Sequence, residues 1–227
     1  MAKYEMHLHT SECDICAAVS GSEAVRLYKA AGYDGMVVTN HYFSMFSEWY
    51  GIEQTEENHR RYLDRWLLGY REALAEGEKI GFSVFLGAEV RFDGANINDY
   101  LVYGLSEDDI YNLPYLNKLS NVKEMISLLP ENALVVHAHP FRCGMTVEDP
   151  SLLFGIEVHN GGTDAHRNEL ARLYAEHYGK KQLSGSDFHA ARHLARGGIE
   201  TEKTVRNYEE LLSILRAGNY SLIENSD

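Results

Sequence analysis

The sequence has few cysteines and no long apolar run. Its three cysteines are Cys13, Cys16 and Cys143, and the opening residues MAKYEMHLHT lack the apolar run of a signal peptide. No stretch approaches the length of a membrane span. The odd number of cysteines indicates a reducing compartment, and the single Cys13-x-x-Cys16 pair is read as free thiols rather than a zinc or redox site. We therefore expect a cytoplasmic protein with no membrane partner.

Basic residues are also scarce. There are 21 Lys and Arg against 34 Asp and Glu, which gives a formal net charge of −13. Such a surface repels a phosphate backbone, so long nucleic acid is a poor partner. Part of the acidity is consistent with carboxylates that bind divalent cations.

We find no internal repeat, low-complexity segment or linker, and no Walker-type or GxGxxG pattern at a strand-to-helix turn. No Ser-His-Asp arrangement can be argued from the sequence either. Hydrophobic residues make up 44% of the chain, enough for a buried core. We expect residues 1–227 to form a single domain.

Short apolar runs that suit buried strands alternate with helical periodicity. A helix is expected from Ser22, as N-cap, to Gly32, and a long one at 56–79. Further helices are expected at 121–129, 164–177 and 208–217. Strands are expected at 4–9, 35–39, 82–90, 100–105, 133–138, 155–159, 181–185, 199–205 and 220–223. This alternation predicts a parallel sheet with helices outside, and about seven strands favour a closed barrel over an open sheet.

Histidine and acidic residues occur at the ends of these expected strands. In a parallel barrel the carboxyl ends of the strands meet at one mouth, where sites are built. Alternate residues of a strand project to one side, so His7-x-His9 and Asp187-x-His189 each offer two neighbouring ligands for a metal. The candidate metal ligands are His7, His9, Asp14, His41, Glu89, His139, Asp187 and His189.

Other histidines have a weaker claim to a metal. His137 and His159 suit a ligand role and a structural role equally well. Four more, His59, His166, His177 and His193, fall on expected helices and are read as surface groups or as residues that support a ligand.

These residues resemble the motifs of the polymerase and histidinol phosphatase (PHP) family, across nearly the whole chain. The motifs, in family order, are His7-Leu-His9-Thr with Asp14, Val38-Thr-Asn-His41, Gly87-Ala-Glu89, Ala138-His139-Pro140 and Gly185-Ser-Asp187-Phe-His189. The resemblance implies a distorted parallel (β/α)7 barrel, a single PHP domain over residues 1–227, and two or three divalent metal ions.

By the same resemblance, the ligands fall into three groups. His7, His9, Glu89 and Asp187 would hold the first metal, and Glu89 and His139 the second. Asp14, His41 and His189 would hold the third.

The sequence also departs from the family pattern. Asn40 replaces the usual Asp before His41, and the family's further His after the fourth strand is absent. That second site is left to Asp99, His159 or water. Zinc, manganese and iron all tolerate such ligands.

The expected activity is hydrolysis of a phosphate ester by a hydroxide held between metal ions. Arg142, Asp187 and His189 are the candidate catalytic residues, with Arg142 as the clamp on phosphate oxygens. Arg192 and Arg167 are weaker candidates for that clamp, and a surface salt bridge is the alternative role for each arginine.

A phosphomonoesterase acting on a small phosphorylated metabolite is the favoured function. The alternatives are a nuclease or phosphodiesterase on nucleotides or short oligonucleotides, a hydrolase of C–N bonds, and a non-catalytic metal-binding or regulatory module. The sequence names neither the substrate, the metal nor the oligomeric state.

Overall fold

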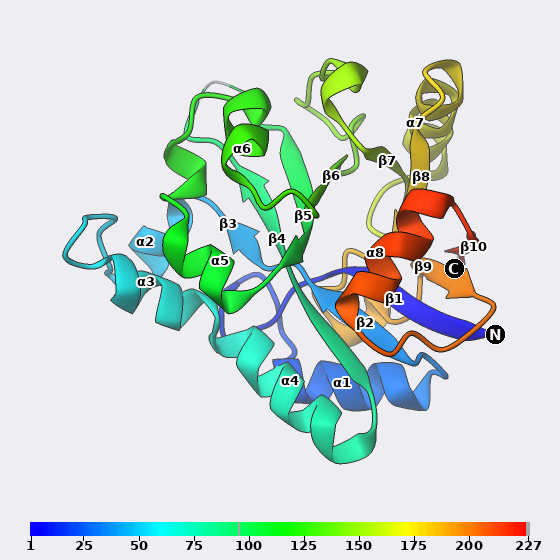
Figure 1. Cartoon of the computed structure of the whole chain (residues 1–227), viewed down its shortest axis with the longest axis horizontal. Helices are drawn as coiled ribbons and strands as arrows, with labels where there is room; N and C mark the ends of the chain where they lie inside the picture. Colours follow the sequence, from blue (N-terminus) through cyan, green and yellow to red (C-terminus); the bar gives the residue numbers. More distant parts are fainter. Residues whose placement is uncertain (95, 226–227) are drawn as a thin grey trace.

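The computed structural model describes residues 1–94 and 96–225, and within them ten strands form one curled sheet (Figure 1). The strands are β1 (Ala2–Leu8), β2 (Gly35–Val38), β3 (His41–Tyr42), β4 (Ser83–Arg91), β5 (Asp99–Leu105), β6 (Leu134–His137), β7 (Gly155–Asn160), β8 (Lys181–Gly185), β9 (Gly197–Thr201) and β10 (Tyr220–Glu224). Their order is β10-β9-β1-β2-β4-β5-β6-β7-β8, with β3 beside β4.

The sheet curls until β1 meets the segment that follows β8. Leu8 and Phe188 form a parallel bridge. Two backbone hydrogen bonds flank it, from Phe188 N to the His7 oxygen (3.1 Å) and from His9 N to the Phe188 oxygen (3.0 Å). The expected α/β barrel is therefore confirmed as a mixed α/β fold with a nearly closed, barrel-shaped sheet. The expected count of seven strands is not confirmed.

The expectation that all strands run parallel is wrong for β5 and β9. β5 pairs antiparallel with both β4 and β6, whereas β1–β2, β2–β4, β6–β7 and β7–β8 are parallel. The reason is the short connection 92–98, which has no room for the crossover that a parallel neighbour needs. β9 also runs antiparallel to β1, and it ends at Thr201 rather than at the expected Val205.

The helices pack outside the sheet or across its end (Figure 1). They are α1 (Gly21–Ala30), α2 (Met45–Tyr50), α3 (His59–Trp66), α4 (Leu68–Ile80), α5 (Glu107–Asn112), α6 (Val122–Leu128), α7 (Ala165–His177) and α8 (Tyr208–Ala217), with short 3-10 turns η1 (Leu116–Lys118), η2 (Pro150–Leu152) and η3 (Ala191–His193). Among the described residues, no helix combines the length and apolar character needed to cross a bilayer.

Two helix expectations are wrong in detail. α1 is capped by Ser20, whose side chain accepts from Glu23 N, and not by Ser22. The long helix expected at 56–79 is two helices, α3 and α4, that meet at Leu67. Beyond that point Gly69 allows α4 to pack tightly, because a Cβ there would lie 1.9 Å from Thr10 Oγ1.

Hydrophobic side chains form the core of the fold, and polar side chains gather at one end of the sheet. One cluster gathers Tyr4, Met6, Leu101 and Tyr103 with leucines of α8. Along β4, Ala88 and Val90 instead belong to a second cluster that packs against the surrounding helices. Because successive side chains of a strand alternate, Glu89 faces the opposite way, toward the inside of the curl.

Candidate metal centre

Glu89 lies at the middle of a group of buried imidazoles. Its carboxylate is 3.4 Å from His7 Nε2, 3.3 Å from His9 Nε2 and 3.0 Å from His139 Nε2. Asp187 Oδ1 lies 3.6 Å from His7 Nε2 and 3.4 Å from His9 Nε2. The ends of β1, β4, β6 and β8 thus bring these five side chains to one place, as the strand-end argument predicts.

His41 and His189 extend this group on the side of His9. Their ring centroids each lie 4.2 Å from that of His9. We call His7, His9, His41, Glu89, His139, Asp187 and His189 the rim cluster. Sets of three residues whose ligand atoms lie within 4.8 Å of one another are His9/His41/His189, His7/His9/Glu89, His7/His139/Asp187 and Glu89/Asp99/His139.

Asp99 occupies the place where the family pattern has another histidine. Its Oδ2 is 3.9 Å from His139 Nε2, and its side chain is buried. Both of its oxygens also accept from Arg91, at 2.7 Å from Nε and 2.5 Å from Nη2. Of the three sequence candidates for this place, Asp99, His159 and water, the structure brings Asp99 to Glu89 and His139 but not His159.

A bulge in β1 turns His7 and His9 toward the cluster. The pairing register with β2 slips between Glu5 and Leu8, and one extra residue changes which side chains face inward. Glu5 accepts the freed N–H groups of Met6 and His7 at 2.9 Å each, and that of Ser186 at 2.8 Å. One buried carboxylate therefore ties the His7 segment to the segment that carries Asp187.

Hydrogen bonds on the far side of the rings aim several Nε2 atoms at the cluster. His7 Nδ1 bonds Glu157 Oε1 at 2.8 Å, and His9 Nδ1 bonds Asp14 Oδ2 at 2.7 Å. His189 Nδ1 donates to the Asp187 carbonyl oxygen at 3.0 Å. Such outer contacts fix ring orientation in metal sites.

The donor set fits divalent cations. Within the described residues, His7 Nε2 and His9 Nε2 are buried and make no hydrogen bond. Buried polar atoms normally have a partner, so these lone pairs point to an ion. Imidazole and carboxylate are ligands that zinc, manganese and iron accept.

Without a cation the cluster balances its charge by holding protons. Burial opposes protonation of His7 and His9, but the surrounding carboxylates outweigh it and raise both pKa values well above the usual range. The same competition raises the pKa of His41 to about 10. Burial alone would raise the pKa values of Glu89 and Asp187, yet their histidine neighbours hold them well below the usual range. A metal ion would displace these protons.

Two candidate ligands adopt a backbone conformation that is costly for their residue types. His139 has φ 28° and Asp187 has φ 51°, in the left-handed region. Strain of this kind persists where the surroundings impose it, commonly at functional sites.

Arg142, the expected phosphate clamp, lies beside the cluster. Its Nη2 atom donates to Asp187 Oδ2 at 2.5 Å, to Asn160 Oδ1 at 3.0 Å and to Thr163 Oγ1 at 3.2 Å. The other guanidinium nitrogens take part in none of these bonds. Arg167 pairs with Asp164 on the surface of α7, and Arg192 is exposed on η3. Among the described contacts, neither of them reaches the rim cluster.

Two of the weaker histidine candidates lie apart from the cluster. His137 stacks on Tyr100 with 5.4 Å between ring centroids, and its pairing with Tyr100 puts it on the side of the sheet away from Glu89. His159 donates from Nε2 to the Arg196 oxygen at 2.9 Å and lines a neighbouring cavity. The metal-ligand interpretation of both is therefore not supported, because the strand alternation turns one away and a backbone carbonyl occupies the other.

Several residues of the site were missed by the sequence analysis. Glu5 and Glu157 are buried acidic residues that each lie two positions before a histidine of the same strand, a signal that could have identified them. Cys16 is a third case: partial burial opposes its ionisation, but hydrogen bonds with His189 and His41 lower its pKa to about 6. Its thiol therefore lies beside the rim cluster.

Comparisons with known proteins give one family match, over part of the chain. Residues 165–220 match the family model described as PHP-associated. No curated protein matches the chain significantly.

Solved structures share the fold at low identity. One is a two-domain protein from Bacteroides vulgatus described as containing a "predicted PHP-like metal-dependent phosphoesterase" (16% identity, TM-score 0.67, 99% of this chain covered). This chain spans 65% of that protein. Another is PsfC from Pseudomonas syringae (17%, TM-score 0.65, covering 100% of this chain and 93% of PsfC).

A third is an amidohydrolase from Chromobacterium violaceum with bound sulfate and no metal (15%, TM-score 0.59, covering 100% and 99%). These likenesses show the fold. The PHP-associated match is confined to residues 165–220.

Proposed function

We propose that the protein is a metal-dependent hydrolase that releases phosphate from small phosphate monoesters. The observation that carries this proposal is the convergence of Glu89 and Asp187 on buried histidine nitrogens, with Arg142 bonded to the same Asp187. Acids and imidazoles hold cations, and a guanidinium beside them matches phosphate oxygens.

The residues have distinct tasks in this proposal. His7, His9, Glu89 and Asp187 would hold one cation, Glu89 and His139 a second with Asp99 beside them, and His41 and His189, next to His9, a third. Divalent cations bound there would activate water and offset charge on the phosphoryl oxygens. Glu157 and Asp14 keep the His7 and His9 rings in place through their Nδ1 atoms.

Arg142 is assigned to the phosphate group. Its side chain is about one-third exposed, and Asp187 holds one of its nitrogens, Nη2. The other guanidinium nitrogens would bind the phosphate oxygens. In the reaction, the oxygen of water bonds to phosphorus, the bond from phosphorus to the alcohol oxygen breaks, and the alcohol leaves with a proton.

The test is a phosphate-release assay on protein loaded with Mn²⁺, with p-nitrophenyl phosphate as a general substrate. Release that a chelator abolishes and Mn²⁺ restores is expected. Arg142→Ala should raise KM or lower kcat by about tenfold or more, as loss of a charged contact predicts. Arg167→Ala, on the outer surface of α7, is the matched control. Release of mononucleotides from short oligonucleotides, with no action on monoesters, would favour the phosphodiesterase alternative and contradict the proposal.

A further inference from the structure

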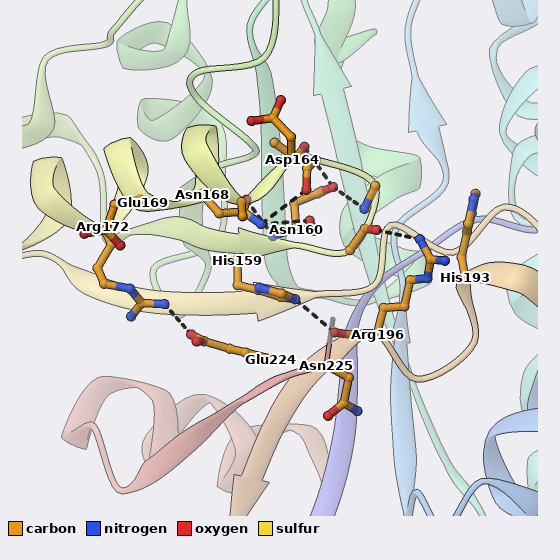
Figure 2. A pocket seen from close by; sticks show the side chains of 14 residues that line it. His159, Asn160, Asp164, Asn168, Glu169, Arg172, His193, Arg196, Glu224 and Asn225 are labelled. Carbon is orange, nitrogen blue, oxygen red and sulfur yellow. Dashed lines mark hydrogen bonds and ion pairs between the residues drawn. The ribbon is translucent and has the colours of Figure 1, made fainter. Parts of the chain in front are cut away.

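A cavity of about 610 Å³ lies beside the rim cluster, between the loop after β7, helix α7, the segment that precedes β9 and the end of β10 (Figure 2). Its walls come from residues 159–165, from α7, and from His193, Arg196, Glu224 and Asn225. Small-molecule sites commonly have volumes in this range.

The wall between the cavity and the rim cluster is thin. Gly162 lines the cavity, and a Cβ added to it would lie 3.4 Å from Asp187 Oδ2 and 3.5 Å from Arg142 Nη2. Asn160, in the same wall, bonds both of these side chains. On the other side of the opening, His193 accepts from His189 N at 3.2 Å. A phosphate at Arg142 would therefore have its ester oxygen within reach of this cavity.

The described residues that line the cavity are polar or small. They include two guanidinium groups, three carboxylates and three side-chain amides, and the remaining lining residues are glycine, alanine, threonine and histidine. Figure 2 shows Arg172 reaching across to Glu224, its ion-pair partner, and His159 bonded to the Arg196 oxygen.

The polar lining of this cavity favours some alcohol parts of a phosphate ester over others. A sugar or polyol hydroxyl both donates and accepts, so it can bond carboxylates and guanidinium groups alike. A nucleobase stacks on aromatic rings, and among the described lining residues only His159 and His193 have one, of which His159 is held by its bond to the Arg196 oxygen. The excess of carboxylates over guanidinium groups also disfavours a second phosphate.

We propose that this cavity receives the alcohol part of the substrate, and that this alcohol is a small polyhydroxylated molecule of the sugar or polyol type. The inference rests on the proposed phosphomonoesterase function. Hydroxyl groups bond the charged and amide side chains of the cavity while the phosphate lies against Arg142.

The experiment compares substrates and a blocked cavity. Wild-type protein loaded with Mn²⁺ is assayed on hexose and pentose phosphates, glycerol phosphate, nucleoside monophosphates and p-nitrophenyl phosphate. Ala165→Trp places a large ring into the cavity from the first turn of α7, and Glu169→Trp does so one turn later. Leu173→Trp, at an exposed position of the same helix, is the control.

Sugar or polyol phosphates should be the best substrates. Both cavity variants should raise KM for them by about tenfold or more, whereas Leu173→Trp should leave KM within about twofold of wild type. Circular dichroism shows whether each variant folds. If one cavity variant does not fold, the KM values of the other cavity variant test the inference. Nucleoside monophosphates as best substrates, or equal effects of all three tryptophans, would overturn the inference alone. Absence of phosphate release even from p-nitrophenyl phosphate would instead overturn the proposed function, and the inference with it.

Discussion

Glu157 Oε1 and His7 Nδ1 are joined by a hydrogen bond of 2.8 Å between two fully buried side chains. The other carboxylate oxygen of Glu157 accepts from His139 N and from Asn160 Nδ2, at 2.9 Å each. A single carboxylate thus positions two candidate ligands and the residue that contacts Arg142.

Glu157→Gln should weaken metal binding by about 10- to 100-fold, the usual effect of losing a group that orients a ligand. The glutamine side chain has one oxygen and one NH2 group, and the NH2 group must face a hydrogen-bond donor of His7, His139 or Asn160. At least one of the three hydrogen bonds that Glu157 accepts is therefore lost. Isothermal titration with Mn²⁺ measures the effect, and Glu176→Gln on the exposed side of α7 is the control. Equal Mn²⁺ affinities of Glu157→Gln and Glu176→Gln would show that Glu157 does not support metal binding.

Glu5 is expected to contribute to the free energy of unfolding. Glu5→Leu leaves the N–H groups of Met6, His7 and Ser186 buried without an acceptor, which should destabilise the fold by about 3 kcal/mol or more. Glu5→Gln keeps one oxygen for these donors and should lose much less. Denaturant unfolding compares the two, and similar losses for both would show that the charge of Glu5, not its position as an acceptor, matters.

The sequence predicted the strand positions well because apolar runs and strand-end histidines are local signals. It placed Glu89, His139 and Asp187 at strand ends, and the structure brings them together. It did not predict the β1 bulge, because a register slip depends on the neighbouring strand. Glu157 was missed for a similar reason: its partners, His7 and His139, are distant in the chain. The junction of α3 and α4 at Leu67 lies beside the close approach of Gly69 to Thr10, a long-range contact that periodicity does not record.

His137 gives a pH prediction. Burial, with a smaller effect of His139, lowers its pKa from 6.5 to about 3. The unfolded chain therefore takes up a proton below about pH 6.5 that the folded chain refuses, so stability present above that pH is lost as pH falls toward 3. His137→Phe should remove this loss, roughly 1.4 kcal/mol per pH unit at most. Unfolding curves from pH 8 to 4 measure it, and parallel pH profiles for wild type and variant would contradict the assignment.

Cys16 should be unusually reactive in the metal-free protein. Since the thiolate is the nucleophile and the pKa is lowered to about 6, alkylation should rise with pH to a midpoint near that value. Mass spectrometry after brief iodoacetamide treatment follows the reaction site by site, with Cys16→Ser as control. A midpoint at the ordinary thiol value of about 8.5 would show that His189 and His41 do not act on this thiol.

The central claim, that the rim cluster holds divalent cations, is tested most directly by counting ions. Protein is stripped with a chelator, dialysed against Mn²⁺ or Zn²⁺, and analysed for bound metal per chain. Two or three ions are expected for the wild type and for His177→Ala, whose histidine lies at the exposed end of α7. Fewer are expected for Glu89→Gln and for the His7→Ala/His9→Ala pair. Less than one ion per wild-type chain, or no loss in these variants, would contradict the account.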